Sequence, residues 1–204
     1  MTSSIAQASC HCAASPPFSQ PTRGDPDERA IIPILVRPLD HGAAIVVYSS
    51  TKYLGGHGTS IGGLIVDGGN FDWTEFPERQ PAFNTPDASY HGAVWVEAVK
   101  PIGPVAYIIK ARTTLLRDLG SAISPFNAFL TLQGVETLAL RIERHSASAA
   151  KVAEFLGQRP EVVRLIHPSQ QSGEARRRAD TYLRGGQGGL VGFELAAGSL
   201  ARAA

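Results

Sequence analysis

The residues with the clearest chemical potential are a lysine and the hydroxyls beside it. The run Ser49-Ser50-Thr51-Lys52 follows a short apolar segment and leads into the glycine-rich residues 55–58. Hydroxyls and backbone N–H groups bind phosphate oxygens, and glycines let the main chain approach a ligand closely. The pattern therefore indicates a phosphate site that also holds a primary amine.

Lys52 can serve such a site in two ways. It can place a positive charge beside a phosphate, or it can act as a nucleophile that forms a Schiff base with an aldehyde. The second role requires its pKa, about 10.4 in a free side chain, to be lowered by burial or by nearby cations. A Ser-x-Thr-Lys run also occurs by chance, and a lysine at a strand end is usually just solvated. A nucleotide-binding P-loop fits poorly, because its lysine follows the glycines and precedes the Ser or Thr.

Two strands are predicted on either side of the lysine. Residues 44–48 are apolar and β-branched without alternation, which predicts a short buried strand. Residues 61–66 predict another strand, and the run Asp67-Gly68-Gly69 ends it. Lys52 is therefore expected in a turn between two strands.

Helical segments are expected in the middle of the chain. Residues 73–90 contain several prolines and no clear period, which predicts a loop with short helical pieces. A helix is expected near residues 94–99. Another is expected over residues 111–119, where Gly120 ends it.

The longest predicted helix follows a shorter one. Pro125 is expected to start a helix over residues 126–133, and Gly134 to end it. Apolar residues then recur at steps of four and three, which predicts a single helix over residues 135–156. The members of this stripe are Leu138, Ile142, His145, Ala149, Val152 and Leu156.

The C-terminal part predicts two strands with a basic segment between them. The strands are expected at residues 162–166 and 190–195. The basic segment contains Arg176-Arg177-Arg178, which predicts a solvated helix face more than a binding patch.

The composition restricts the class of protein. Charged residues make up 18% of the 204 residues and the net charge is +1, so a nucleic-acid partner is not expected. The 21 glycines and 14 prolines favour tight turns between short elements, which fits an α/β fold. No apolar run is long enough to cross a bilayer and no secretory leader opens the chain, so we expect a cytoplasmic protein with no membrane partner.

The N-terminal residues differ in composition from the remainder. Residues 1–28 are rich in Ser, Ala, Pro and Gln and have no apolar period, which predicts disorder. Cys10 and Cys12 flank His11, too close together to join distant parts of a fold. They also lack the spacing of a structural zinc site, so we expect reduced thiols and no metal.

A longer stretch around Lys52 resembles a known family. Residues 37–63 begin RPLDHGA and end SSTKYLGGHGTSIGG, and they closely resemble the cofactor-lysine segment of the Cys/Met-metabolism pyridoxal-phosphate enzymes. Residues 67–73, 90–92, 117–129 and 133–145 look specifically like the O-acetylhomoserine sulfhydrylase branch. The resemblance covers about residues 32–195.

The resemblance implies a fold and a division of the chain. The expected architecture is part of an α/β fold-type I, aminotransferase-like transferase with a parallel-rich sheet. Residues 1–30 would be a disordered head and 31–134 part of the large domain that binds pyridoxal 5'-phosphate (PLP). Residues 135–204 would be the start of the small C-terminal α+β domain.

The resemblance also implies roles for single residues. Carried over by position, Lys52 would bind the cofactor covalently, and Ser49 and Thr51 would hold its phosphate. Gly58 would shape the loop after the lysine. Asp27 stands at the family's spacing for the carboxylate that pairs with the ring nitrogen; its neighbours do not resemble a buried strand end, so a solvated loop aspartate is the alternative.

The implied reaction is a γ-replacement that converts O-acetyl-L-homoserine and sulfide, or a thiol, to L-homocysteine and acetate in a homo-oligomer. Much of the family's N-terminal half and its substrate-carboxylate arginine have no counterpart in this sequence, so we expect a chain that is weakly active or inactive alone. One alternative is a related trans-sulfuration enzyme, either a cystathionine γ-synthase or a methionine γ-lyase. The other is a non-catalytic fragment that docks on a full-length relative.

Overall fold

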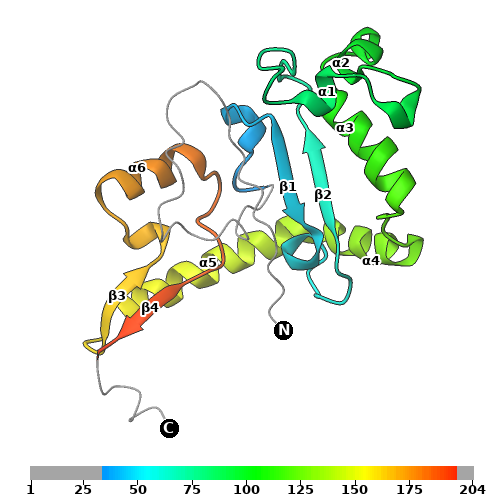
Figure 1. Cartoon of the computed structure of the whole chain (residues 1–204). Helices are drawn as coiled ribbons and strands as arrows, with labels where there is room; N and C mark the ends of the chain where they lie inside the picture. The colour runs from blue at the N-terminus through cyan, green and yellow to red at the C-terminus, as the bar shows by residue number, and fades with distance from the viewer. Residues whose placement is uncertain (1–33, 197–204) are drawn as a thin grey trace.

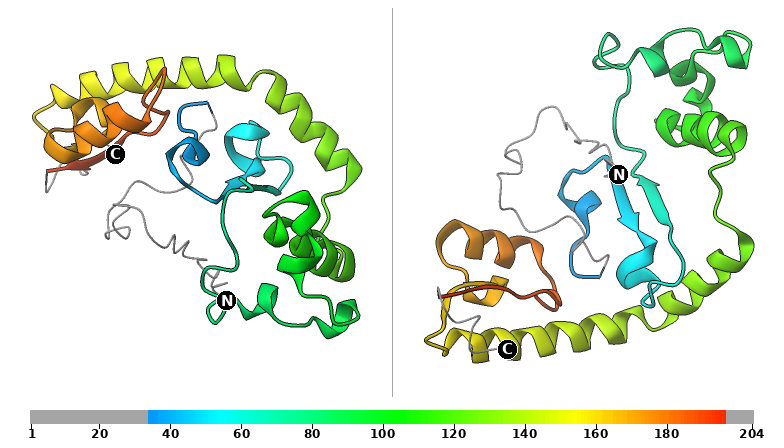
Figure 2. Two further views of the ribbon diagram at one scale, coloured as in Figure 1. Left: turned by 90° about the horizontal axis from the view of Figure 1, so that it is seen from above. Right: turned by 60° about the horizontal axis from the view of Figure 1, so that its bottom comes forward.

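The computed structural model describes residues 34–196, so the N-terminal head with Cys10, Cys12 and Asp27 lies outside the described residues. A β-hairpin stands in the middle, with a group of short helices on one side and a helix-and-strand unit on the other (Figure 1). Two long helices run end to end along one side of all three parts and form a curved arc (Figure 2). The hairpin points its loop at the place where these two helices meet.

The central hairpin is formed by β1 (Ile45–Ser49) and β2 (Gly63–Asp67), which confirms a turn between two strands around Lys52. The strands are antiparallel, with Val46 opposite Val66. The resemblance implied a parallel-rich sheet, but both sheets of the described residues are two-stranded and antiparallel. Here β1 and β2 are joined by a loop without the crossover that a parallel pair needs.

The prediction that the first strand is buried is only partly correct. Val46 is 5% exposed, whereas Val47 is 65% exposed and the side chains of β2 are open to solvent along most of its length. Only one face of the hairpin is packed within the described residues, so strands with an apolar sequence carry an exposed apolar face.

Short helical pieces follow the hairpin as predicted for residues 73–90 and 94–99. They are α1 (Pro81–Asn84), the 3₁₀ turn η4 (Ala88–Tyr90), α2 (Trp95–Ala98) and the 3₁₀ turn η5 (Lys100–Ile102). The helix predicted over residues 111–119 begins earlier, at α3 (Ala106–Lys110), and continues as the π-helix η6 (Ala111–Arg117). Buried Trp95, Val99 and Ala106 form the core of this group.

The first long helix extends further than predicted. It is α4 (Pro125–Glu136), capped by the Ser124 hydroxyl, which accepts a hydrogen bond from the Asn127 amide at 3.2 Å. Gly134 was predicted to end it but is buried within its last turn, against the loop that follows Lys52. The tertiary contact keeps a glycine inside a helix despite its low intrinsic propensity.

The second long helix begins later than predicted. Thr137, with φ −100° and ψ 6°, separates α4 from α5 (Leu138–Gly157). The buried positions of α5 are Leu138, Ile142, Ser146, Ala149 and Ala153. The predicted stripe was therefore wrong at two places: His145 is exposed and Val152 is 48% exposed, because the buried face follows small residues.

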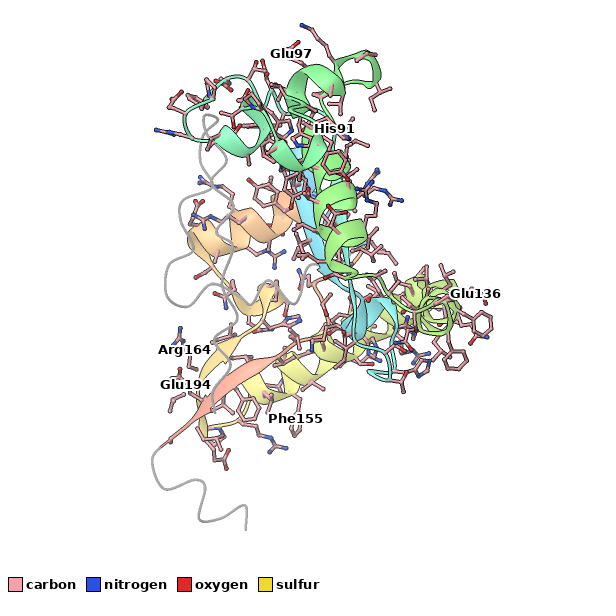
Figure 3. All side chains as sticks on the ribbon, turned by 45° about the vertical axis from the view of Figure 1, so that its right-hand side comes forward. His91, Glu97, Glu136, Phe155, Arg164 and Glu194 are labelled. Atoms are coloured by element: carbon pink, nitrogen blue, oxygen red, sulfur yellow. The ribbon has the colours of Figure 1, made fainter. Side chains whose placement is uncertain are left out.

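The C-terminal unit is an antiparallel pair with a helix between its strands. The strands are β3 (Val162–Ile166) and β4 (Gly192–Leu195), near their predicted positions, and α6 (Gly173–Tyr182) lies between them after the 3₁₀ turn η7 (Pro168–Gln170). Arg164 and Glu194 face each other across the strands in Figure 3 and form an ion pair of 2.9 Å.

The predicted arginine-rich helix face is confirmed. Arg176 pairs with Asp180, and Arg177 and Arg178 pair with Glu174, all on α6 with largely exposed side chains. Within residues 34–196, no helix is both long and apolar enough to cross a membrane.

Candidate active site

Lys52 lies in a tight helical turn, η3 (Ser50–Leu54), immediately after β1. Its own φ and ψ, −86° and −122°, are not helical, so the chain changes direction at this residue. The Gly55 amide donates to the Ser50 carbonyl at 2.9 Å, and the Gly56 amide donates to the Lys52 carbonyl at 2.8 Å. These bonds enclose the lysine in a compact loop at the strand end.

The far end of the loop is tied back to its beginning. The Ser50 amide donates to the Gly62 carbonyl at 2.9 Å, and the Gly62 amide donates to the Thr51 hydroxyl at 3.0 Å. A Cβ on Gly62 would lie 2.8 Å from the Ser50 hydroxyl oxygen, so a larger residue there would require the Ser50 side chain to move. The loop after β1 is therefore closed by both backbone and side-chain bonds.

A cavity of about 500 Å³ opens beside this loop. Its volume is within the range of about 300–1,000 Å³ that small-molecule sites occupy. The lining residues come from three segments: the loop of residues 50–62 that contains Lys52 (the lysine loop), α5, and the segment before β4. They are Thr51, Lys52, Tyr53, Gly56, Gly58, Arg141, His145 and Leu190.

The structure separates the hydroxyls that the sequence placed together. Thr51 lines the cavity with Lys52, whereas Ser49 is exposed at the end of β1 and is not among the lining residues. Ser50 is 2% exposed, and its hydroxyl has no hydrogen-bond partner within the described residues. Ser49 is the last residue of β1 and Ser50 the first of η3, so the two serines lie on either side of the point where the chain turns.

Two lining residues come from α5 and were not predicted as site residues. Arg141 donates to carbonyls of the lysine loop, and the His145 ring stands edge-to-face against Tyr53 with centroids 5.8 Å apart. We predicted His145 for the buried stripe, but it faces the cavity. The spacing of four between the two residues puts them on one helix face, and this was the available signal.

No acidic side chain is among the lining residues of this cavity. Asp27, the predicted partner of the ring nitrogen, lies outside the described residues. Across residues 34–196 there is also no group of three or more His, Cys, Asp or Glu residues that could hold a metal ion. Besides Tyr53, Arg141 and His145, the described part of the site offers the Lys52 amine, the Thr51 hydroxyl and the backbone of a glycine-rich loop.

Residues 27–204 match the family described as Cys/Met metabolism PLP-dependent enzyme. The chain belongs to this family. It is 52% identical over 172 residues to an O-acetyl-L-homoserine sulfhydrylase of Leptospira meyeri, covering 81% of this chain and 38% of that protein. It is 48% identical over 157 residues to the homocysteine/cysteine synthase of Saccharomyces cerevisiae, covering 77% of this chain and 35% of that protein.

A solved structure of the same family has the same fold over most of this chain. It is a putative O-acetylhomoserine (thiol)-lyase of Campylobacter jejuni that contains a pyridoxyl-lysine phosphate group, with a TM-score of 0.72 and 38% identity. The match covers 83% of this chain and 40% of that structure. A cystathionine γ-lyase of Lactobacillus plantarum, solved with L-serine, matches with a TM-score of 0.57 and 27% identity over 84% of this chain and 35% of that structure.

The chain spans about two fifths of the length of these relatives. The matches support the resemblance read from the sequence around Lys52. The fold is therefore part of a fold-type I PLP-dependent enzyme, and the described residues are the lysine loop, the helices beneath it and the unit that follows.

Proposed function

We propose that this chain is part of a PLP-dependent O-acetylhomoserine sulfhydrylase in which Lys52 carries the cofactor. The observation that carries the proposal is the position of Lys52 beside Thr51 on a cavity of about 500 Å³, in a loop closed at the end of β1. A substituted pyridine ring with one phosphate arm is small enough for a cavity of this volume.

The residues present fit the aldehyde and phosphate ends of PLP. Lys52 would hold the aldehyde end, because a primary amine can bond covalently to an aldehyde carbon. The Thr51 hydroxyl accepts from the Gly62 amide, and its own proton has only a long contact of 3.4 Å to the Gly62 carbonyl, so the proton is available to a phosphate oxygen. By resemblance we also propose Ser49 as a second phosphate contact, although it is not among the lining residues of the cavity in the described part of the chain. Asp27, outside the described residues, is the proposed contact to the ring nitrogen.

The proposed reaction of the whole enzyme is a γ-replacement. Acetate leaves the γ-carbon of O-acetyl-L-homoserine, and the sulfur of sulfide or a thiol bonds to that carbon, which gives L-homocysteine when sulfide is used. When bound, PLP supplies the electron sink for this chemistry, and the freed Lys52 amine carries protons at the substrate carbons. We also propose that the enzyme is a homo-oligomer. The boundary between its large and small domains is proposed to lie between residues 134 and 135.

The comparisons favour the sulfhydrylase over a cystathionine γ-lyase. The thiol-lyase structure matches at a TM-score of 0.72 and 38% identity, against 0.57 and 27% for the cystathionine γ-lyase. The substrate separates the two functions: homocysteine from O-acetyl-L-homoserine and sulfide supports the sulfhydrylase, whereas 2-oxo acid from cystathionine or methionine alone supports a lyase.

The direct test is a titration of the purified chain with PLP, followed by the visible absorbance of the lysine-bound cofactor. We expect saturable binding by the unmodified chain and by Lys151→Ala, which removes an exposed lysine of α5. We expect no such absorbance with Lys52→Ala. Equal absorbance in Lys52→Ala and the unmodified chain would contradict the proposal.

A further inference from the structure

Arg141 makes an unusual set of hydrogen bonds with the lysine loop. Its guanidinium donates to the carbonyls of Tyr53 at 2.8 Å and Leu54 at 3.3 Å. It also donates to the Gly134 carbonyl at 2.6 Å and, through Nε, to the Thr137 hydroxyl at 3.1 Å. One side chain thus joins the turn that contains Lys52 to the junction between α4 and α5.

The carbonyls that Arg141 binds are the ones that a short helical turn leaves without partners. At the C-terminal end of any helical turn the last carbonyls have no amide to accept from. In η3 the backbone bonds use the carbonyls of Ser50 and Lys52, and Arg141 takes those of Tyr53 and Leu54. Without Arg141, two partly buried carbonyls next to the lysine lose their donor.

The fit between loop and helix leaves no space for side chains. A Cβ on Gly56 would lie 2.7 Å from the guanidinium carbon of Arg141, and a Cβ on Gly134 would overlap the Gly55 carbonyl. The loop therefore rests directly on Arg141 and on the last turn of α4. A shift of the guanidinium has to move the loop.

Arg141 is not arranged to clamp a carboxylate. Four of its five N–H donors are engaged within the chain, which leaves one. A paired grip on a carboxylate needs two parallel donors, so it would break a bond to the loop.

We propose that Arg141 is a positioning residue that holds the turn of Lys52 so that the amine faces the cavity. The inference rests on the proposed role of Lys52 in binding PLP. The Arg141 guanidinium reduces the motion of residues 50–56 and keeps the lysine oriented toward an incoming aldehyde. Lysine at position 141 would be a poor substitute, because an ammonium is a point donor without the planar fork.

The test compares the full chain with Arg141→Gln, Arg141→Lys and, as the matched control, Arg144→Gln on the exposed side of the same helix. Two quantities are measured: hydrogen exchange of the peptide covering residues 50–56 without PLP, and the rate at which PLP is trapped by borohydride on Lys52 relative to Lys151. Dividing the trapping rate on Lys52 by the rate on Lys151 cancels any change in the reactivity of the reagent or in the folded fraction of the chain.

We expect Arg141→Gln to raise exchange in residues 50–56 selectively and to lower the trapping ratio about tenfold. Arg141→Lys should fall between it and the unmodified chain, and Arg144→Gln should behave as the unmodified chain. An unchanged trapping ratio in Arg141→Gln would overturn the proposal. So would a loss of protection throughout residues 34–196 in both Arg141 variants, because Arg141 would then serve the whole fold.

Failure of the proposed function has a different signature. If the unmodified chain traps no PLP on Lys52, the cofactor role of Lys52 fails. In that case selective exchange in residues 50–56 would still show that Arg141 fixes the loop, whereas unchanged exchange would overturn that as well.

Discussion

Around Lys52 the main chain is held by its neighbours on both sides. Thr51 is bonded to Gly62, and the carbonyls of Tyr53 and Leu54 are bonded to Arg141. The lysine side chain itself stays exposed. This combination of a fixed backbone and a free amine is what a cofactor lysine requires, because the amine must reach an aldehyde in a defined direction.

The sequence alone proposes Lys52 as the cofactor lysine, but it does not reveal which residues surround it. Ser49 ends β1 and Ser50 begins η3, and the turn places Thr51, not Ser49, among the residues that line the cavity. The sequence alone does not reveal this difference. Arg141 is 88 residues from Tyr53 in sequence, and a contact over that distance leaves no local pattern.

Asp87 gives the residue-scale prediction for pH dependence. Its carboxylate binds Lys110 at 2.6 Å and also accepts from Ser89 and from the Trp95 indole, and these bonds, Lys110 first, hold its pKa well below the usual value. A carboxyl with a lowered pKa stabilises the fold above its unfolded pKa of about 4, and the effect is lost as the pH falls below that value. We expect Asp87→Asn to lower the melting temperature at pH 7 and to differ progressively less below pH 4.

Glu97→Gln is the matched control for this series. Glu97, labelled in Figure 3, pairs with Lys100 at 3.7 Å, but both side chains are more than half exposed. Such surface pairs contribute about 0–1 kcal/mol, so a small change at every pH is expected. Thermal unfolding from pH 2 to pH 8 measures both variants, and a constant difference for Asp87→Asn across that range would contradict the assignment.

Among the elements, the strands and helices near Lys52 were predictable to within a few residues. Apolar runs and glycines marked β1 and β2, and Pro125 marked the start of α4. The prediction at Gly134 was wrong. Glycine often ends a helix, but here it lies inside one and leaves room for a neighbouring loop. A single sequence does not distinguish these two uses of glycine.

Gly134→Ala tests the contact between α4 and the lysine loop. Helix propensity alone predicts stabilisation by about 1 kcal/mol. The overlap with the Gly55 carbonyl predicts the opposite, a loss of about 1–3 kcal/mol, because neither backbone can move aside freely. Denaturant unfolding decides between the two signs.

Gly157→Ala provides the comparison for that variant. A Cβ at Gly157, the last residue of α5, would lie 3.5 Å from a Leu165 methyl, an ordinary contact. We expect no destabilisation from it. A loss at Gly157 equal to that at Gly134 would mean that the close approach of Gly55 is not the cause.

The buried face of α5 gives a further prediction. Ile142 is 1% exposed and packs with Leu35, Leu54 and Leu138, so Ile142→Ala should cost about 2–5 kcal/mol. Val152, which the sequence placed on the same stripe, is 48% exposed, so Val152→Ala should cost less than about 1 kcal/mol. Similar losses of unfolding free energy at the two positions, measured with denaturant, would mean that Val152 is buried as the sequence predicted.

At the scale of the whole molecule, apolar side chains remain open along α4 and the hairpin. Phe126, Phe129 and Leu132 of α4 are each more than half exposed, as is Val47 of β1. Exposed apolar area of this kind marks an association surface, and open strand edges add to it.

We therefore expect the purified chain to associate. Sedimentation velocity should give species heavier than the 21.6 kDa chain, and their proportion should rise with concentration. Replacing Phe126 and Phe129 by glutamine should shift the distribution toward the single chain. A sharp monomer at all concentrations would contradict the assignment of these residues to an association surface.

The family is settled by the sequence match over residues 27–204, whereas the proposed function depends on one covalent bond, between Lys52 and PLP. The measurement that tests it most directly is peptide mapping after incubation with PLP and reduction with borohydride. We predict a pyridoxyl group on Lys52 at PLP concentrations that leave the exposed Lys100 and Lys151 unmodified. Modification spread evenly over the lysines, or none on Lys52, would contradict it.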